Sequence, residues 1–148
     1  MTGIVALGVL VIAFVALVSA ITMAINGLRE RNAAMLESSR LAALTSFPLL
    51  SLSLAILLFF LVTGRFEFAY VFETTDATMP LYLKIAALWG GQSGSLLFWC
   101  WLLYGFVFFA FLNKKKIDQQ LTPWVIIVTS VTLGFFILMV VFFENPFL

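Results

Sequence analysis

The sequence contains no histidine, a single cysteine and few charged residues, and each shortage excludes a class of function. Histidine is the most common metal ligand in proteins and the usual group that titrates near neutral pH. We therefore expect no metal or redox chemistry from this chain alone. A single cysteine excludes an internal disulfide and a Cys-x-x-Cys redox motif. The chain is interpreted as one component of a larger assembly.

The shortage of charge identifies the class of protein. Only 10% of the 148 residues are charged, whereas 64% are hydrophobic. Soluble domains carry about 25% charged residues, which cover their surface. The net charge of +1 gives no sign of a nucleic-acid partner. The composition therefore predicts an integral membrane protein.

Long apolar segments predict four membrane spans. The hydrocarbon layer of a bilayer is about 30 Å thick, so a spanning helix needs about 20 apolar residues. Uncharged segments of this kind cover residues 4–25, 44–62, 95–112 and 124–143. The first is expected to be a retained helix, because no Lys or Arg precedes it as in a signal peptide. We predict a single all-α membrane domain over residues 1–148.

The basic residues of the short loops predict the orientation. Loops rich in Lys and Arg stay on the cytoplasmic side. The first and third loops, residues 26–41 and 113–122, are basic, whereas residues 63–94 carry more acidic than basic side chains. The basic residues of the two short loops are Arg29, Arg31, Arg40, Lys114, Lys115 and Lys116. Both termini and the loop 63–94 are therefore expected outside.

The external loop has two distinguishable parts. Residues 65–72 alternate polar and aromatic side chains, which favours an extended stretch on the membrane surface. Residues 79–89 contain a proline near their start and one charge, Lys84, beside Tyr82 and Trp89. Aromatic residues of this kind favour the membrane–water interface. This second part is predicted to be an external amphipathic helix between spans 2 and 3.

A turn rich in glycine and serine joins that helix to the third span. Glycines permit unusual backbone geometry or the close approach of another surface. Ser93 or Ser95 is expected to cap the third span, which leaves N–H groups that can bind an anion. The turn consists of Trp89, Gly90, Gly91, Gln92, Ser93, Gly94 and Ser95. The alternative is a tight turn between two helices that binds nothing.

Aromatic residues and the lone cysteine follow in the third span. Two interpretations stay open for Trp99, Trp101 and Tyr104: a flat aromatic wall, and interface anchoring and packing, which the pattern favours at least equally. Cys100 lies between the two tryptophans. A thiol in apolar surroundings is inert, so we expect Cys100 to be a packing residue.

Four motifs in a fixed order carry a resemblance to a known family. They are Glu-Ser-Ser-Arg at residues 37–40, Phe-Ala-Tyr-Val at 68–71, the stretch 79–99, and Asn-Pro-Phe at 145–147. Their order and spacing resemble the N-terminal part of cytochrome c maturation protein F (CcmF), the integral membrane component of the cytochrome c haem lyase. The resemblance covers the chain from about Glu37 onward. The stretch 79–99 is its most specific part.

The resemblance implies a role in cytochrome c-type biogenesis. Family members receive haem outside the membrane from a carrier protein and help to attach it to the Cys-x-x-Cys-His thiols of apocytochrome c. Their tryptophan-rich segment and haem-binding histidines lie beyond the matched region. Haem is therefore expected to be ligated by a partner chain, and this chain is at most a non-catalytic part of the lyase. Many members have His-Glu where this chain has Gln92 and Ser93, and Gln92, which cannot titrate near neutral pH, is expected to face the external cavity.

The turn and Trp99 are therefore predicted to form a haem-facing surface. The expected partners are the histidine-bearing remainder of the lyase, the haem carrier, apocytochrome c and membrane lipid. The expected location is the inner (plasma) membrane, or the mitochondrial inner membrane if the source is organellar. A separate N-terminal subunit is favoured over a truncated copy. The alternative function is a structural assembly subunit, or a transporter fragment, without haem contact; a transporter would be expected to carry charges inside its spans.

Overall fold

The computed structural model describes residues 2–112 and 121–147, and these residues form six helices and no strands. Four of the helices are long and apolar enough to cross a membrane, which confirms the predicted number of spans. These four are α1 (Thr2–Glu30), α2 (Ala33–Thr63), α5 (Gln92–Leu112) and α6 (Thr122–Phe142). Two shorter helices, α3 (Ala69–Thr74) and α4 (Leu81–Gly90), connect α2 to α5.

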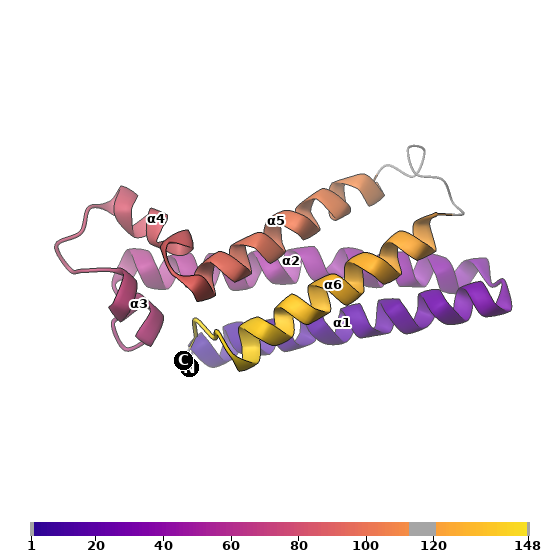
Figure 1. Ribbon diagram of the computed structural model, residues 1–148, viewed down its shortest axis with the longest axis horizontal. Helices are drawn as coiled ribbons and strands as arrows, with labels where there is room; N and C mark the ends of the chain where they lie inside the picture. The colour runs from indigo at the N-terminus through magenta and orange to yellow at the C-terminus, as the bar shows by residue number, and fades with distance from the viewer. Residues whose placement is uncertain (1, 113–120, 148) are drawn as a thin grey trace.

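The long helices form a bundle in which neighbours along the chain run in opposite directions (Figure 1). Helix α1 packs on α2 and α6, and α5 packs on α2 and α6, so the four helices close a ring. Helices α3 and α4 gather at one end, together with the start of α1 and the end of α6 (Figure 1). The connection between α1 and α2 lies at the other end.

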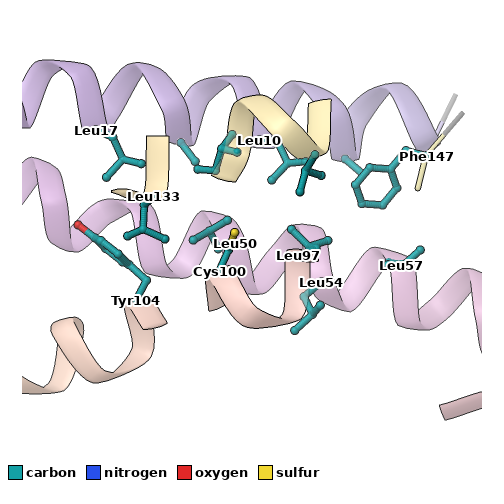
Figure 2. Close-up of a cluster of buried hydrophobic side chains, with 14 of the residues drawn as sticks. Leu10, Leu17, Leu50, Leu54, Leu57, Leu97, Cys100, Tyr104, Leu133 and Phe147 are labelled. Atoms are coloured by element: carbon teal, nitrogen blue, oxygen red, sulfur yellow. The ribbon is translucent and has the colours of Figure 1, made fainter. Parts of the chain in front are cut away.

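The inner face of α1 alternates small and large residues. Alanine lets two helix backbones approach closely, and leucine fills the space between such contacts. The residues of this stripe, all fully buried, are Ala6, Leu10, Ala13, Leu17, Ala20 and Ala24. Figure 2 shows Leu10 and Leu17 directed toward Leu50 of α2 and Leu133 of α6. The outward faces of the spanning helices are as apolar as their inward faces. The inward face of α1 therefore differs from its outward face in side-chain size rather than in polarity.

The predicted first loop, residues 26–41, is wrong. Helix α1 continues to Glu30 and α2 begins at Ala33, so only Arg31 and Asn32 connect them. Arg31 adopts a left-handed backbone with φ of 53°. The side chain of Asn32 then caps α2 by accepting the N–H groups of Ala34 at 3.1 Å and Met35 at 3.3 Å. The charged residues of this segment do not end the helices, because water solvates their side chains where a helix extends beyond the hydrocarbon layer.

Arg40 connects α2 to the end of α5. One guanidinium nitrogen, Nη1, donates to the carbonyl oxygen of Phe111 at 2.8 Å, and Nε and Nη2 donate to the carboxylate of Glu37 at 3.1 and 2.8 Å. The last carbonyl groups of a helix have no partner within the helix and carry partial negative charge, which a cation stabilises. The lysines predicted to anchor the third loop, at positions 114, 115 and 116, lie outside the described residues.

The prediction of an extended stretch over residues 65–72 is also wrong. Gly64, with φ of 68°, ends α2, and the chain turns into α3. The ring of Phe68 stacks on Phe60 of α2 with centroids 4.4 Å apart, and Val71, one helical turn later, is fully buried. Burial at this helical spacing, rather than the alternation of polar and aromatic residues, decides the local structure.

The helix predicted after the proline is present as α4, with Pro80 at its N-cap. Its position at the membrane surface stays a prediction. Helix α6 carries Pro123 in its first turn and ends at Phe142. Beyond it, Asn145 donates from Nδ2 to the carbonyl of Val141 at 3.3 Å and accepts the N–H of Phe147 at 2.9 Å. The Asn-Pro-Phe motif therefore closes the end of α6.

Candidate functional site

The predicted turn is a sharp corner between α4 and α5, with Gly91 between the two helices. Tyr70 of α3 lies beneath this corner and is 6% exposed. Its hydroxyl lies 2.7 Å from the carbonyl oxygen of Ala87 and 3.0 Å from that of Leu88, and it accepts the N–H of Gly91 at 3.3 Å. Burial raises the pKa of Tyr70, which keeps the hydroxyl protonated as a donor. Tyr70 thus fixes the angle between α4 and α5.

Two glycines of the corner are required by the closeness of Tyr70. A Cβ atom at Gly91 would lie 2.5 Å from the Tyr70 ring. A Cβ atom at Gly94 would collide with the Leu88 carbonyl oxygen and the Tyr70 hydroxyl. Gly90 differs, because a Cβ atom there would meet nothing within 4 Å. The packing reason for glycine therefore holds at positions 91 and 94 and not at position 90.

The expectation that Ser93 or Ser95 caps the third span is wrong. Helix α5 begins at Gln92, so both serines lie inside its first turn. Ser93 Oγ instead donates to the carboxylate of Glu144, just beyond α6, at 3.1 Å. A carboxylate near the start of a helix is stabilised by the exposed N–H groups there. The anion at the start of α5 is therefore the carboxylate of Glu144, a residue of this chain.

Three side chains of the predicted surface point away from the protein. Trp89 is 52% exposed and Trp99 is 65% exposed, and Gln92 is exposed as well. The ring centroid of Trp89 lies 5.6 Å from that of Phe98. Gln92 and Trp99 are seven residues apart, about two helical turns, so they share one face of α5. This face presents an amide and a large aromatic ring to its surroundings.

For Trp101 and Tyr104 the structure bears out packing, the alternative to an aromatic wall. Trp101 packs inward, where its Nε1 donates to Ser51 Oγ of α2 at 2.8 Å. Tyr104 is fully buried. Trp99 and Trp101 are two positions apart and therefore leave the helix on different faces, whereas Trp101 and Tyr104, three positions apart, both turn inward. Cys100 is buried in the core, as predicted.

The site offers contact to a flat ligand but no metal centre. Within the described residues, no three His, Cys, Asp or Glu side chains are grouped so that they could hold a metal ion. The whole sequence has no histidine. Exposed tryptophan rings suit the face or edge of a planar apolar molecule such as a porphyrin. The exposed rings are therefore suited to contact a planar ligand, and the described residues supply no group of metal ligands for it.

Sequence reasoning gave no role to Tyr70 or Glu144. Tyr70 is part of the Phe-Ala-Tyr-Val motif, and Glu144 directly precedes Asn-Pro-Phe. The motifs thus indicated that both segments matter, but not which contacts they make. Their contacts with the corner lie 21 and 51 residues away along the chain, and no local pattern shows contacts at such separations.

Comparisons with known proteins agree with this architecture. No family model matches the chain. The cytochrome c-type biogenesis protein CcmF of Haemophilus influenzae is 31% identical over 121 residues, which is 82% of this chain and 19% of that protein. The chain belongs to the CcmF family. CcmF of Escherichia coli is 29% identical over the same length, and the probable biogenesis protein NrfE of that species is 34% identical over 125 residues.

A solved structure shows that the CcmF fold is shared. The cytochrome c haem lyase CcmF has a TM-score of 0.91 to this chain at 19% identity. The match covers 99% of this chain and 25% of the solved one. The chain thus spans about a fifth to a quarter of the length of the CcmF relatives that it matches.

Proposed function

We propose that this chain contributes a haem-facing surface to a cytochrome c haem lyase at the outer face of a bacterial inner membrane. The surface is Trp89 to Ser95 together with Trp99, and its role is to position haem rather than to catalyse. The observation that carries the proposal is the corner between α4 and α5. Packing on Tyr70 holds this corner rigid while Trp89, Gln92 and Trp99 stay exposed.

The charges at the two ends of the bundle support this orientation. Among the described residues, acidic side chains outnumber basic ones at the end that holds α3, α4 and the corner. The opposite end has more basic than acidic side chains. The corner end carries Arg65, Lys84, Glu67, Glu73, Asp76 and Glu144, and the other end carries Arg29, Arg31, Arg40, Glu30 and Glu37. The basic end is the one expected in the cytoplasm.

Haem would be shared between this chain and the histidine-bearing remainder of the lyase. Bound haem supplies the vinyl groups that react with the thiols of apocytochrome c. The tryptophan rings of this chain would contact the porphyrin, and the amide of Gln92 would donate or accept one hydrogen bond. Glu144 at the start of α5 would repel a propionate, so the propionates are expected to lie away from that helix start.

The test replaces Trp99 by alanine in cells that depend on this chain for cytochrome c maturation. Covalently bound haem on cytochrome c is measured by in-gel peroxidase staining. The tagged chain is also purified in mild detergent, and its haem absorbance and co-purifying proteins are recorded. We expect a roughly tenfold loss of holocytochrome c and haem, equal to about 1.4 kcal/mol of lost contact, with partner proteins retained. Phe106→Ala is the matched control. Phe106 is also exposed, and it lies on the same helix about two turns farther from the corner than Trp99.

The rival function, a structural assembly subunit without haem contact, predicts a different result. Loss of partner proteins together with haem after Trp99→Ala would indicate an assembly surface. Unchanged holocytochrome c would remove Trp99 from the functional surface. The observation that favours this rival is that Glu144 occupies the helix start where the sequence predicted binding of an anion.

A further inference from the structure

Three hydroxyl groups from three helices meet inside the bundle. They belong to Ser46 of α2, Tyr104 of α5 and Ser130 of α6, and all three residues are 0% exposed. The Tyr104 hydroxyl lies beside both serine hydroxyls. Figure 2 shows the oxygen of Tyr104 directed away from α5 into the bundle. None of the three oxygens makes a hydrogen bond of acceptable geometry with another group of the described residues.

Several other hydroxyl groups of the spanning helices are satisfied within the protein. Ser51 donates to the carbonyl of Phe47 at 2.9 Å, and Thr129 donates to that of Val125 at 2.6 Å. Ser53 crosses to α1 and donates to the carbonyl of Ala6 at 3.1 Å. Inside a membrane no bulk water can replace a missing partner, so unsatisfied polar groups are costly there. Three of them at one point indicate a common partner.

We propose that Ser46, Tyr104 and Ser130 hold one water molecule between α2, α5 and α6. Buried waters typically make about three hydrogen bonds to polar groups that are otherwise unsatisfied. Each hydroxyl can donate or accept, and a water molecule can do both, so all three groups are satisfied together.

The surroundings select a neutral ligand rather than an ion. The buried polar residues of the described chain are all uncharged, namely Ser39, Ser46, Ser53, Thr75 and Ser130. A metal ion in such a place would lack a compensating charge. Water needs none, and one molecule bound to all three hydroxyls links the three helices.

The three tyrosines of the chain allow a direct test. The full chain, labelled with ¹³C at tyrosine Cζ, is placed in bilayers with deuterated acyl chains, and magnetisation transfer from water is measured by solid-state NMR. The labelled positions are Tyr70, Tyr82 and Tyr104. Tyr82 is 70% exposed and serves as the positive control. We expect rapid transfer to Tyr104 although it lies inside the bundle.

A variant with Ser46→Ala and Ser130→Ala is the matched comparison. It keeps the tyrosine and removes two of the three groups that hold the water, so transfer to Tyr104 should fall about threefold. Unchanged chemical shifts of Tyr70 and Tyr82 establish that the double variant folds. If these shifts change, the single variant Ser130→Ala is used in its place. Absence of transfer to Tyr104 in the unaltered chain overturns the proposal. Equal transfer to Tyr104 in the unaltered chain and in the serine variant also overturns the proposal.

Discussion

At one end of the bundle, α1 and α2 are joined by Arg31 and Asn32 alone, whereas at the other end two helices fill the connection between α2 and α5. The first end is closed by a charged side chain, Arg40, that satisfies a helix-terminal carbonyl. The second is closed by a buried tyrosine beneath two glycines and leaves its tryptophans exposed. The same need, to satisfy backbone groups at the ends of spanning helices, thus produces a simple closure at one end and a shaped surface at the other.

The largest effect is expected from the glycines of the shaped end. Gly94→Ala places a methyl group against the Leu88 carbonyl and the Tyr70 hydroxyl, so the corner must open. We expect a loss of about 3 kcal/mol in unfolding free energy, at the upper end of overpacking effects, together with loss of holocytochrome c. Thermal unfolding in detergent and haem staining measure the two effects. Gly90→Ala is the control for the packing effect and should leave the unfolding free energy unchanged, because its Cβ meets nothing within 4 Å; equal losses of stability at positions 90 and 94 would contradict the role of Tyr70.

The closed end is tested by Arg40→Ala. This change removes the hydrogen bonds to the Phe111 carbonyl and to Glu37, and we expect a loss of about 2 kcal/mol in unfolding free energy. Chemical denaturation of the purified chain provides the measurement. Arg29→Ala, at an exposed position of the same end, should change stability by less than about 0.5 kcal/mol. If the two variants are equally stable, Arg40 does not fasten α5.

Tyr70→Phe separates the hydroxyl from the ring at the shaped end. The ring remains in place, and the lost hydrogen bonds should cost about 1 kcal/mol. The effect depends on pH. Because the folded pKa is raised above the ordinary value of 10.0, the contribution of the hydroxyl is complete below pH 10 and declines as the pH rises through the folded pKa. The stability difference between the two proteins should therefore shrink above pH 10, and a difference that grows there would show that the hydroxyl ionises readily in the folded protein.

The smallest effect is expected from Glu144→Gln. Glutamine can still accept the hydroxyl of Ser93, and only the charge near the start of α5 is lost. We expect a change of about 0.5 kcal/mol or less, the size of a charge–helix-dipole interaction at a surface. The same unfolding assay measures it at low and high salt. A larger loss, insensitive to salt, would indicate that the carboxylate supports the corner by more than its charge.

The errors of the sequence-based predictions share a physical cause. Three predictions were made from local patterns: the loop 26–41, the extended stretch 65–72 and the serine cap. Local patterns also left open whether Trp101 and Tyr104 pack inward. In this chain every spanning helix carries apolar side chains on all of its faces, so polarity does not show which face turns inward. Helix ends and side-chain directions were decided instead by partners such as Phe60 beneath Phe68 and Ser51 opposite Trp101.

The sequence by itself determined that the chain is a membrane protein with four candidate spans, that a helix follows Pro80, that Cys100 is buried, and that the motifs belong to the CcmF family. Length, hydrophobicity and local residue order are sufficient for these, because each depends on neighbours along the chain. Only the tertiary structure decided that Tyr70 supports Gly91 and Gly94, that Arg40 reaches Phe111 across 71 positions, and that Ser46, Tyr104 and Ser130 share one point. These depend on which faces of uniformly apolar helices meet, and close packing of side-chain shapes, rather than the exclusion of water, makes that choice.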